Sequence, residues 1–587
     1  MHKLSHAIVL LGGILVFTGQ VPLAQQSSSP TVRVEAQQLE QQKPIERELK
    51  AKETHVYALQ LEAGQFLGAA VNQRGIDLVV RVFAPDGKLI SEIDSPNGMQ
   101  GDEPIALATT TTGTYRIEVS QLEDEGNSVA GRYEIRVNEI LSADAYARRL
   151  AERKLKQQAV IAWLKENAIA LKTVEAGNGF KDLQPLKRVL KDVRFVGLGE
   201  ETHGTREFFQ FKHRMVEFLV KEMGFRVFAI EASYSACQNI NDYVMGKTDD
   251  GAGALDSQRF WTWNTEEVRA MLDWMRRYNA SVPADRKVKF VGFDIQGNAT
   301  GKTKLLEYLK RVAPERVAQT DSFFKVDEGE VLYAAASEKG ESAKDALAKA
   351  TELNNKYSDL FAFLEISGPQ LVAKSSLAEY EQIREYARVI LQNIDAYSYS
   401  GSRGSSRRDL YMADIFRRIV EREPTGTRFV IWAHNAHVAT GDGDGTDPAF
   451  GNHLRHFYSK DYYALGFSFN QGAFQAREGQ PKDPATRMLM SFTTKPAPDD
   501  SIDWYLAQTG PKSLIVDFRS LRKNAEIDEW LTTPRPMRSV GAVYALSFEP
   551  NSFTPITISK EFDGLFFIDT TTRARPNPSV KNVAPAQ

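Results

Sequence analysis

Two segments decide the fold of this chain: Val193-Arg-Phe-Val-Gly-Leu-Gly-Glu-Glu-Thr-His-Gly204 and, one helix later, Arg226-Val-Phe-Ala-Ile-Glu231. Each contains a short apolar run that stops at charged residues, which is typical of a buried parallel strand. Open α/β sheets bind ligands just beyond the carboxyl ends of such strands, so we expect Glu200, His203 and Glu231 to lie at a site. A base and two acids gathered there favour proton chemistry on a bound substrate.

The residues between the two segments predict an amphipathic helix. Phe208, Phe211 and Met215 recur at helical spacing, and Gly224 is a typical helix end. His203 thus lies at the mouth of a helix, three residues after Glu200. A histidine beside a carboxylate can be held in one tautomer, as a general base requires. The alternative is a histidine that caps the helix or satisfies a core carbonyl.

Alternation of strands and helices continues beyond these segments. It predicts an α/β domain over 176–574, with a mostly parallel sheet and helices on both faces. A helical insertion rich in Ala, Leu, Glu and Lys occupies about 300–400, between the third and fourth strands. The predicted strands lie near 193–198, 226–231, 288–294, 428–434, 461–467 and 513–518.

The N-terminal part has a different pattern. Short alternating strands separated by Gly- and Pro-marked turns predict a small antiparallel β-sandwich over 46–140. Residues 141–175 predict one amphipathic helix that connects the two domains. We expect residues 575–587 to form a disordered tail.

The first residues predict an export signal. Lys3 precedes an apolar stretch over 7–18 that is too short to span a bilayer, and Ala24 is a suitable cleavage position. Residues 1–24 are therefore expected to be a signal peptide, and the polar 25–45 a linker. No later segment has membrane-spanning length, so we expect an exported protein, periplasmic or extracellular.

Composition excludes some functions and leaves others open. The chain of 587 residues has a formal net charge of −3 and no basic run, which gives no electrostatic basis for nucleic-acid binding. Cys237 is the only cysteine, so no intrachain disulfide can form, and it is expected to be buried filler. Oligomeric state stays open.

Further candidate residues follow other predicted strands. Asp294 ends the third strand, and His434 and His437 follow the fourth, in Ile431-Trp-Ala-His-Asn-Ala-His-Val438. The two histidines could join Glu200, His203 and Glu231 around a metal, but their spacing is a weak metal signal. Either could instead donate a proton to a leaving group or stabilise an oxyanion. For Glu231 the alternative is a salt bridge, and for Asp294 the capping of a turn.

Two cations could complete the site. Lys212 follows His203 on the same helix, and Arg408 lies with Arg407 on the helix before the fourth strand. Either could approach the carboxylates or a developing oxyanion, although a solvated helix face is the commoner position for such residues. The sequence has no Gly-x-Ser-x-Gly, His-Glu-x-x-His or Walker motif. Without an evident side-chain nucleophile, activated water is the economical choice.

At several places the chain resembles the erythromycin esterase family, in order over about 180–570. The motifs that carry the resemblance are Gly199-Glu200-x-x-His203-Gly, Glu207-Phe208-Phe, Gly224-Phe-x-x-x-x-x-Glu231, Gly292-Phe-Asp294, Arg408-Asp409-x-x-Met-Ala413, Trp432-Ala-His434-Asn-x-His437-Val and Phe562-Asp563-Gly-Leu-Phe-Phe-Ile568. The resemblance implies metal-independent hydrolysis of a macrolide lactone by water. His203 would be the base, Glu200 and Glu231 would orient it and the water, and His437 or His434 would assist at the carbonyl oxygen or leaving alkoxide.

The family's usual arginine after the histidine motif is Lys212 here. The N-terminal β-domain, an addition, resembles the pre-peptidase C-terminal type. We therefore predict an exported hydrolase of carboxylic esters or macrolactones that acts on small molecules without a metal or other cofactor. Predicted catalytic residues are His203, Glu200, Glu231, His437 and His434; predicted substrate-binding residues are Lys212, Arg408 and Asp294. The alternatives are a metal-dependent hydrolase at the same site, or a non-catalytic surface-binding protein with a degenerate hydrolase domain.

Overall fold

The structure is a computed structural model that describes residues 32–33, 35–95, 98–122, 130–337, 341–399, 401–441, 448–480, 487–520 and 523–584. The predicted signal peptide, 1–24, lies outside the described residues. The chain divides into two compact units, Met1–Glu152 and Arg153–Gln587. The division falls within helix α1 (Ala143–Asn167), in the segment predicted to connect the domains.

The first unit is a small domain of two β-sheets, as predicted. Among the described residues one sheet has six strands and the other four, and the neighbours are antiparallel except where the short β1 and β2 pair with β4. Tyr133, Ile135 and Val137 alternate with more exposed residues and enter the shared core. Part of the predicted linker is structured, because Gln37–Gln38 pairs with β4. The strands are β1 (Val32–Arg33), β2 (Gln37–Gln38), β3 (Ile45–Leu49), β4 (Glu53–Leu61), β5 (Phe66–Arg74), β6 (Leu78–Phe83), β7 (Leu89–Ile93), β8 (Gln100–Ala108), β9 (Gly113–Gln121) and β10 (Gly131–Leu141).

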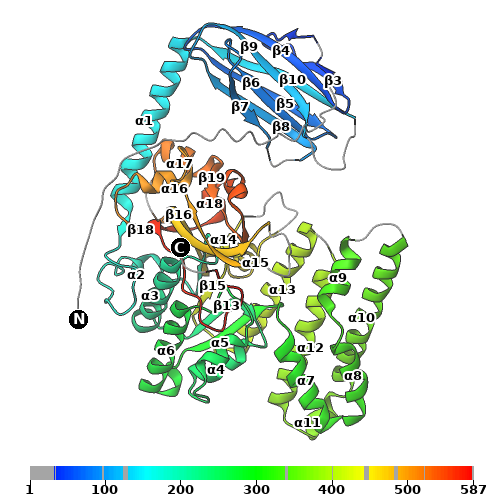
Figure 1. Cartoon of the computed structure of the whole chain (residues 1–587). Coiled ribbons are helices and arrows are strands. Elements are labelled where there is room, and N and C mark those ends of the chain that lie inside the picture. The colour runs from blue at the N-terminus through cyan, green and yellow to red at the C-terminus, as the bar shows by residue number, and fades with distance from the viewer. Residues whose placement is uncertain are drawn as a thin grey trace, which may run out of the picture. The chain divides into compact units, whose positions relative to one another are not determined.

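The second unit contains a mostly parallel sheet, with ten strands in the described part of the chain. Its main order is β11-β18-β22-β16-β12-β15-β13-β14, and β17 and β20 pair with β16. β15 thus lies between β12 and β13, which are separated by one helix in the sequence (Figure 1). The bounds are β11 (Ile169–Ala170), β12 (Phe195–Leu198), β13 (Val227–Ser233), β14 (Lys289–Asp294), β15 (Phe429–Trp432), β16 (Tyr462–Glu478), β17 (Leu489–Thr494), β18 (Ser513–Asp517), β20 (Val543–Tyr544) and β22 (Gly564–Thr571).

Helices cover both faces of this sheet, which confirms the predicted architecture. Along β15, Val430 and Trp432 face one core and Phe429 and Ile431 face the other. Residues of α3 (Arg206–Met223), α4 (Cys237–Val244), α5 (Gly251–Asp256) and α6 (Glu266–Ser281) enter the first core. Residues of α13 (Gly401–Arg422), α15 (Phe450–Tyr458), α16 (Ile502–Ala507), α17 (Ala525–Thr532) and the end of α1 enter the second.

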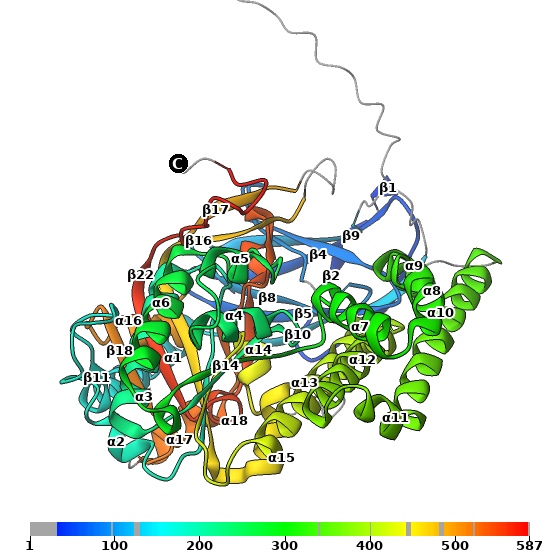
Figure 2. The same cartoon turned by 90° about the horizontal axis from the view of Figure 1, so that it is seen from below.

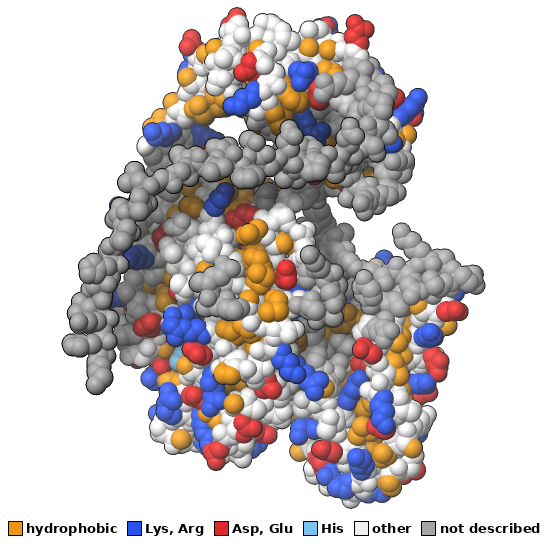
Figure 3. All heavy atoms as spheres, viewed as in Figure 1, with side chains coloured by type: hydrophobic (Ala, Val, Ile, Leu, Met, Phe, Trp, Pro, Cys, Tyr) orange, Lys and Arg blue, Asp and Glu red, His pale blue; other side chains and the backbone are white. Residues whose placement is uncertain are grey.

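A bundle of helices separates β14 from β15, as predicted for about 300–400. It has its own apolar core, to which Leu309, Leu353 and Ile390 belong. The helices lie side by side in both views (Figures 1 and 2). Positive, negative and apolar side chains are interspersed over the face of the bundle shown in Figure 3. They are α7 (Ala299–Val312), α8 (Val317–Phe324), α9 (Glu328–Ser337), α10 (Glu341–Ile366), α11 (Gly368–Ala373) and α12 (Leu377–Tyr397).

The C-terminal segment differs from the expected disordered tail over 575–587. In its described part, Pro576 forms a bridge with Thr265 and Val583 one with Leu489, and Asn577 N donates to Asn264 O at 3.0 Å. These contacts are backbone pairings, and a segment rich in Pro and Asn gives no periodic signal for them. Within the described residues, no helix combines the length and the apolar composition that crossing a bilayer needs.

Candidate active site

The strand order brings the predicted residues to one edge of the sheet. Leu198 of β12 and Ile230 of β13 are both in register with Trp432 of the intervening β15. The residues that follow these three positions therefore lie close together at the same edge of the sheet. They include Glu200, Glu231 and His434, so the predicted convergence at the strand tips is found in the structure.

The turn after β12 presents His203. A Cβ on Gly199 would lie 2.1 Å from Asn435 Oδ1, and a Cβ on Gly204 would lie 2.0 Å from the carbonyl oxygen of Gln475. Only glycine permits such close approach, so the backbone on both sides of the Glu200–His203 pair is packed against neighbouring chain. The helix α3 then starts at Arg206.

Glu200 holds His203 in one orientation. His203 Nδ1 donates to Glu200 Oε1 at 2.7 Å, and the other carboxylate oxygen accepts from Lys212 Nζ at 2.7 Å and from Trp432 Nε1 at 2.9 Å. No described residue hydrogen-bonds the Nε2 of His203, whose side chain is 13% exposed. The imidazole therefore has one nitrogen fixed by a carboxylate and the other available to a small molecule.

Charge neutralisation keeps Glu200 ionised. Burial alone would raise the pKa of Glu200, but Lys212 and His203 lower it below its usual value. Burial also lowers the pKa of Lys212 to about 8, against the opposing effect of Glu200. The Lys212 ammonium lies 4.1 Å from the centre of the Trp432 ring, a favourable cation–π distance.

Lys212 does not have the position predicted for a substrate-binding residue. Its side chain is 0% exposed and lies behind Glu200. The spacing from His203 places it on the inner face of α3, which the sequence could not distinguish from a face lining the crevice. Its role in this structure is to support the carboxylate that holds His203.

Glu201 points away from this group. Its Oε2 accepts from the backbone N of Phe469 at 2.9 Å, and the carboxyl lies beside that of Asp503. Burial, together with Asp503, raises the pKa of Glu201 well above its usual value. The second glutamate of the pair is therefore a buried group that lies outside the crevice.

Glu231 collects donors from three sides. Its Oε1 accepts from Arg408 Nη2 at 2.8 Å and lies 3.2 Å from His437 Nε2, and its Oε2 accepts from the backbone N of His434 at 2.9 Å. Burial alone would raise the pKa of Glu231, but His437 and Arg408 lower it well below the usual value. Glu231 thus contacts Arg408 and His437, and among the described residues it forms no hydrogen bond with His203.

Asp294 and Arg408 form the second half of this cluster. Arg408 Nη2 donates to Asp294 Oδ2 at 2.7 Å and Arg408 Nε to Asp294 Oδ1 at 3.1 Å, a two-point contact that fixes the guanidinium plane. The Arg408 side chain is 18% exposed, whereas that of Asp294 is 1% exposed. Arg408 is thus partly exposed, whereas Asp294 is buried and fixes the orientation of Arg408.

His437 lies between two carboxylates. Its Nδ1 donates to Asp409 Oδ1 at 2.7 Å while its Nε2 faces Glu231. Burial would lower the pKa of His437, but Glu231 and Asp409 raise it to about 10. Arg408 Nη1 also lies 3.1 Å from Nε2, a contact that disfavours a protonated ring. The carboxylates prevail because Asp294 already neutralises much of the guanidinium charge, so His437 is an imidazolium.

His434 is the least suited of the predicted catalytic residues. Its Nδ1 accepts from the backbone N of Ala436 at 3.2 Å, and its Nε2 donates to the carbonyl oxygen of Val540 at 3.2 Å. Burial lowers the pKa of His434 to about 4, and the neighbouring His203 adds to this effect. Its ring lies 4.8 Å from that of His203, so it packs beside the base as a neutral group with both nitrogens engaged.

Two residues of the site were not among the predicted ones. Asp409 accepts hydrogen bonds from His437 and from the backbone N of Phe450 at 2.8 Å. Trp263 donates to the carbonyl oxygen of Glu231 at 3.1 Å and meets the His203 ring edge-on, with 5.8 Å between ring centres. Asp409 directly follows Arg408 in the sequence, which was a usable signal; nothing near Trp263 pointed to the site.

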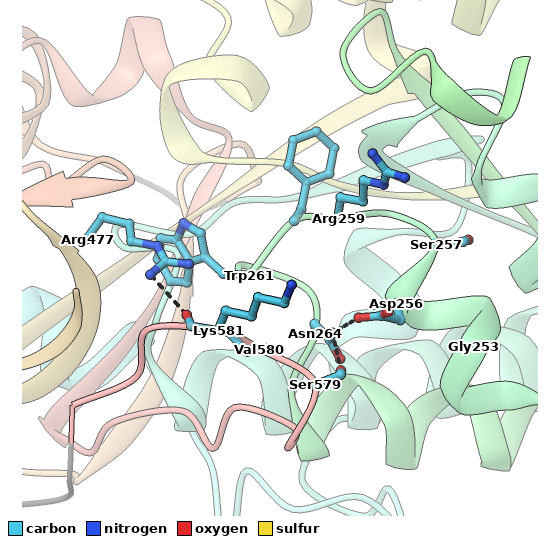
Figure 4. A pocket seen from close by; sticks show the side chains of 11 residues that line it. Gly253, Asp256, Ser257, Arg259, Trp261, Asn264, Arg477, Ser579, Val580 and Lys581 are labelled. Carbon is cyan, nitrogen blue, oxygen red and sulfur yellow. Dashed lines mark hydrogen bonds between the residues drawn. The ribbon is translucent and has the colours of Figure 1, made fainter. Parts of the chain in front are cut away.

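Two cavities of the second unit are lined by neighbours of this group, but neither lining includes His203, Glu231 or Arg408. One of about 470 Å³ is lined by Gln296 and Tyr397, next to Asp294 and Arg408. A larger one of about 590 Å³ is lined by residues of the 257–264 loop, whose Trp263 meets His203 (Figure 4). Phe260 lines both. Among the described residues, no three His, Cys, Asp or Glu side chains are grouped so as to hold a metal ion.

Comparison with known proteins identifies relatives across the second unit. Erythromycin esterase type II of Escherichia coli is 24% identical over 428 residues, which are 70% of this chain and 97% of that protein. The putative hydrolase YbfO of Bacillus subtilis (strain 168) is 24% identical over 437 residues, covering 70% and 90%. A crystal structure of a Bacillus cereus protein has the same fold, with a TM-score of 0.60, 23% identity and coverage of 72% and 99%. The erythromycin esterase family model matches residues 220–571, more than half of the chain, and the protein therefore belongs to this family.

Proposed function

We propose that this protein hydrolyses a carboxylic ester or lactone with a water molecule activated by His203. The observation that carries the proposal is the pair of Glu200 and His203, in which one imidazole nitrogen is fixed at 2.7 Å from a carboxylate and the other is available. Glu200 favours the protonated form of the ring, as a general base requires in the transition state. Family membership supports the same reaction class.

In the proposed reaction, His203 Nε2 takes a proton from water while the water oxygen attacks the carbonyl carbon. The negative charge that develops on the carbonyl oxygen is stabilised by Arg408 and by the His437 imidazolium, whose side chains are 18% and 16% exposed. The carbon–oxygen bond to the leaving group then breaks. The proton on His203 passes to the leaving alkoxide, which gives one carboxylic acid and one alcohol and restores the base.

The site separates its charges to suit these steps. Lys212 and Trp432 both donate hydrogen bonds to one carboxylate oxygen of Glu200. The other carboxylate oxygen is left to the imidazole. Asp294, Glu231 and Asp409 hold the cations on the other side. Such fixed dipoles and charges need no reorganisation when the oxyanion forms, which is how preorganised sites lower barriers.

We propose a macrolide lactone as one substrate, since the similar Escherichia coli protein is named an erythromycin esterase. Hydrolysis of a macrolactone would open its ring with the gain of one water molecule. Export, inferred from the first 24 residues, would place such an activity outside the cytoplasm, where it could inactivate an antibiotic before entry.

The test is substitution of the base. His203→Ala should lower kcat by about a thousandfold or more, because it removes both proton transfers. The thermal midpoint should stay within a few degrees, since the side chain is partly exposed and makes one hydrogen bond. His456→Ala, at an exposed histidine on α15, is the matched control and should keep full activity. Mass spectrometry of erythromycin, seeking the added water, and a panel of simple esters provide the readouts; wild-type turnover by His203→Ala would reject the proposal.

A further inference from the structure

The larger cavity, called here the cationic pocket, is built by three distant segments. Its lining comes from the loop after α5, from the end of β16 and from the C-terminal segment, and its volume is about 590 Å³. Figure 4 shows Arg477, Trp261 and Lys581 on one side and Asp256 and Ser257 on the other. A volume of this size accommodates a small-molecule group with a ring.

Three cations line the cationic pocket: Arg259, Arg477 and Lys581. Within the described residues none of them forms an ion pair with a carboxylate, and Arg477 instead donates to backbone carbonyls, including that of Lys581 at 3.3 Å. The acid of the lining, Asp256, accepts from Asn264 at 3.2 Å. The lining therefore carries an excess of positive charge, which favours an anion.

Arg259 reaches the pocket through an unusual backbone conformation. Its φ is 57°, in the left-handed region that non-glycine residues seldom adopt. Such a conformation costs about 1 kcal/mol or more and persists where the surrounding structure enforces it, often at binding sites. Arg259 lines the cationic pocket together with Arg477 and Lys581, and it also lines a neighbouring cavity of about 310 Å³.

Aromatic residues supply the apolar part of the lining. Phe260 and Trp261 both line the pocket and are only partly exposed. An indole face binds flat rings and guanidinium groups alike. Cations beside an aromatic surface match a ligand that combines a ring with a negative charge.

Two structural links join the lining of the cationic pocket to His203, which does not itself line the pocket. Trp261 and Asn264 flank Trp263, whose ring meets that of His203. On the other side, Gln475 N donates to the carbonyl oxygen of Gly204, the residue after His203, at 3.1 Å. Arg477 lies two residues further along β16, on the same face of the strand.

We infer that the cationic pocket binds a negatively charged, ring-bearing portion of the substrate, the charge being a carboxylate or a phosphate-type group. The inference rests on the proposed esterase function, because it names the class of substrate on which the esterase site would act. The ester carbonyl would lie at His203 while the anionic ring occupies the pocket.

Direct binding tests the inference without any turnover. The probes are 2-naphthoate and 2-naphthylphosphonate, with uncharged 2-naphthamide as the ring-matched control, titrated into the full chain by calorimetry. One or both anions should bind at least tenfold more tightly than the amide, and less tightly as salt is added. The stronger anion identifies the charge type; equal binding of all three probes, or none by either anion, would overturn the inference.

Charge variants locate the binding. Lys581→Gln and Arg477→Gln should each weaken the bound anion by about five- to tenfold, the usual scale of a partly exposed charge contact. Asp256→Asn should strengthen it. Arg575→Gln, on the same C-terminal segment but outside the lining, should leave it unchanged. Unchanged affinity in both Lys581→Gln and Arg477→Gln would also overturn the inference.

Kinetics separate this inference from the proposed function. For two naphthyl-bearing esters that differ only in a carboxylate on the ring, Lys581→Gln should lower kcat/KM for the anionic ester and spare the neutral one. If neither ester is hydrolysed but the naphthoate still binds, the esterase proposal fails and the pocket assignment stands. If both are hydrolysed equally well by wild type and by Lys581→Gln, the pocket assignment fails alone.

Discussion

His434 and His437 show how far partners decide chemistry at the scale of single residues. They stand three positions apart on one short segment, yet burial lowers the pKa of His434 to about 4 while Glu231 and Asp409 raise that of His437 to about 10. One is a neutral packing group and the other a cation. The difference comes from the burial of His434 beside His203 and from the two carboxylates, Glu231 and Asp409, that flank His437.

The His437 imidazolium should be visible in the pH dependence of stability. Its pKa is raised in the folded state, so its contribution is fully present below about pH 6.5 and lost as the pH rises toward 10. Lys212, with a folded pKa lowered to about 8, has the opposite effect above that pH. Between pH 6.5 and 8 the free energy of unfolding should thus fall by up to about 1.4 kcal/mol per pH unit.

Urea unfolding across this pH range provides the measurement, and His437→Asn provides the comparison. The variant has no titrating group at this position, so the difference in stability between wild type and variant should shrink steadily as the pH rises. A difference that stays constant from pH 6.5 to 8 would show that His437 is not protonated in the folded protein.

The sequence could identify the residue types of the site but not their division of labour. The strand ends pointed to Glu200, His203, Glu231 and His437, and each of them has a charged partner in the structure, as a charge that terminates a buried run needs. The sequence could not show that Lys212 lies behind Glu200 instead of facing the crevice. Which side of α3 a residue faces depends on packing against Trp432, a contact between segments more than a third of the chain apart.

At the scale of elements, the turn between β12 and α3 is the part on which the site depends. Its backbone is fixed from outside: the carbonyl of Gly204 accepts from the backbone N of Gln475 and also from that of Ala574 at 2.9 Å. The residue after His203 is therefore held by the end of β16 and by the segment that follows β22. The orientation of the base is set by this packing as well as by Glu200.

Gly204→Ala should disturb the base and the fold together. The added Cβ would lie 2.0 Å from the carbonyl oxygen of Gln475, so the turn must move; we expect a loss of about 2–3 kcal/mol of stability and at least a tenfold fall in kcat. Gly541→Ala is the control, since a Cβ there meets nothing within 4 Å. Denaturation and ester hydrolysis measure both effects; full activity in folded Gly204→Ala would show that the turn can shift without displacing His203.

Element prediction succeeded where periodicity was strong. The predicted strands near 193–198, 288–294 and 513–518 correspond to β12, β14 and β18 within a residue or two. Composition alone misled at both ends of the chain. Gln37–Gln38 and the segment around Pro576 pair through backbone groups, which polar side chains neither favour nor forbid.

At the scale of the whole molecule, two units with separate cores share one chain. The first core contains residues up to Val137, whereas the end of α1 contributes Val160 and Leu164 to a core of the second unit. The helix therefore belongs in part to the unit that carries the candidate active site. A fragment should be divided before α1 rather than after it.

Fragment 143–587 is expected to fold and to keep ester hydrolysis within about twofold of the full chain. Fragment 168–587 lacks Val160 and Leu164, and should lose about 3–6 kcal/mol from the exposure of apolar surface. Thermal unfolding and activity on one soluble ester provide the comparison. Loss of activity in folded 143–587 would mean that the β-domain takes part in the reaction.

Cys237 carries a practical consequence. It is the chain's single cysteine, it is buried, and burial raises the pKa of its thiol. Thiol reagents should therefore not react with it in the folded protein. Any cysteine placed on the surface, for instance at Ser257, would then be the sole labelling position without further engineering. A fluorophore or spin label attached there would report ligand entry into the cationic pocket, with no signal from a second labelled cysteine.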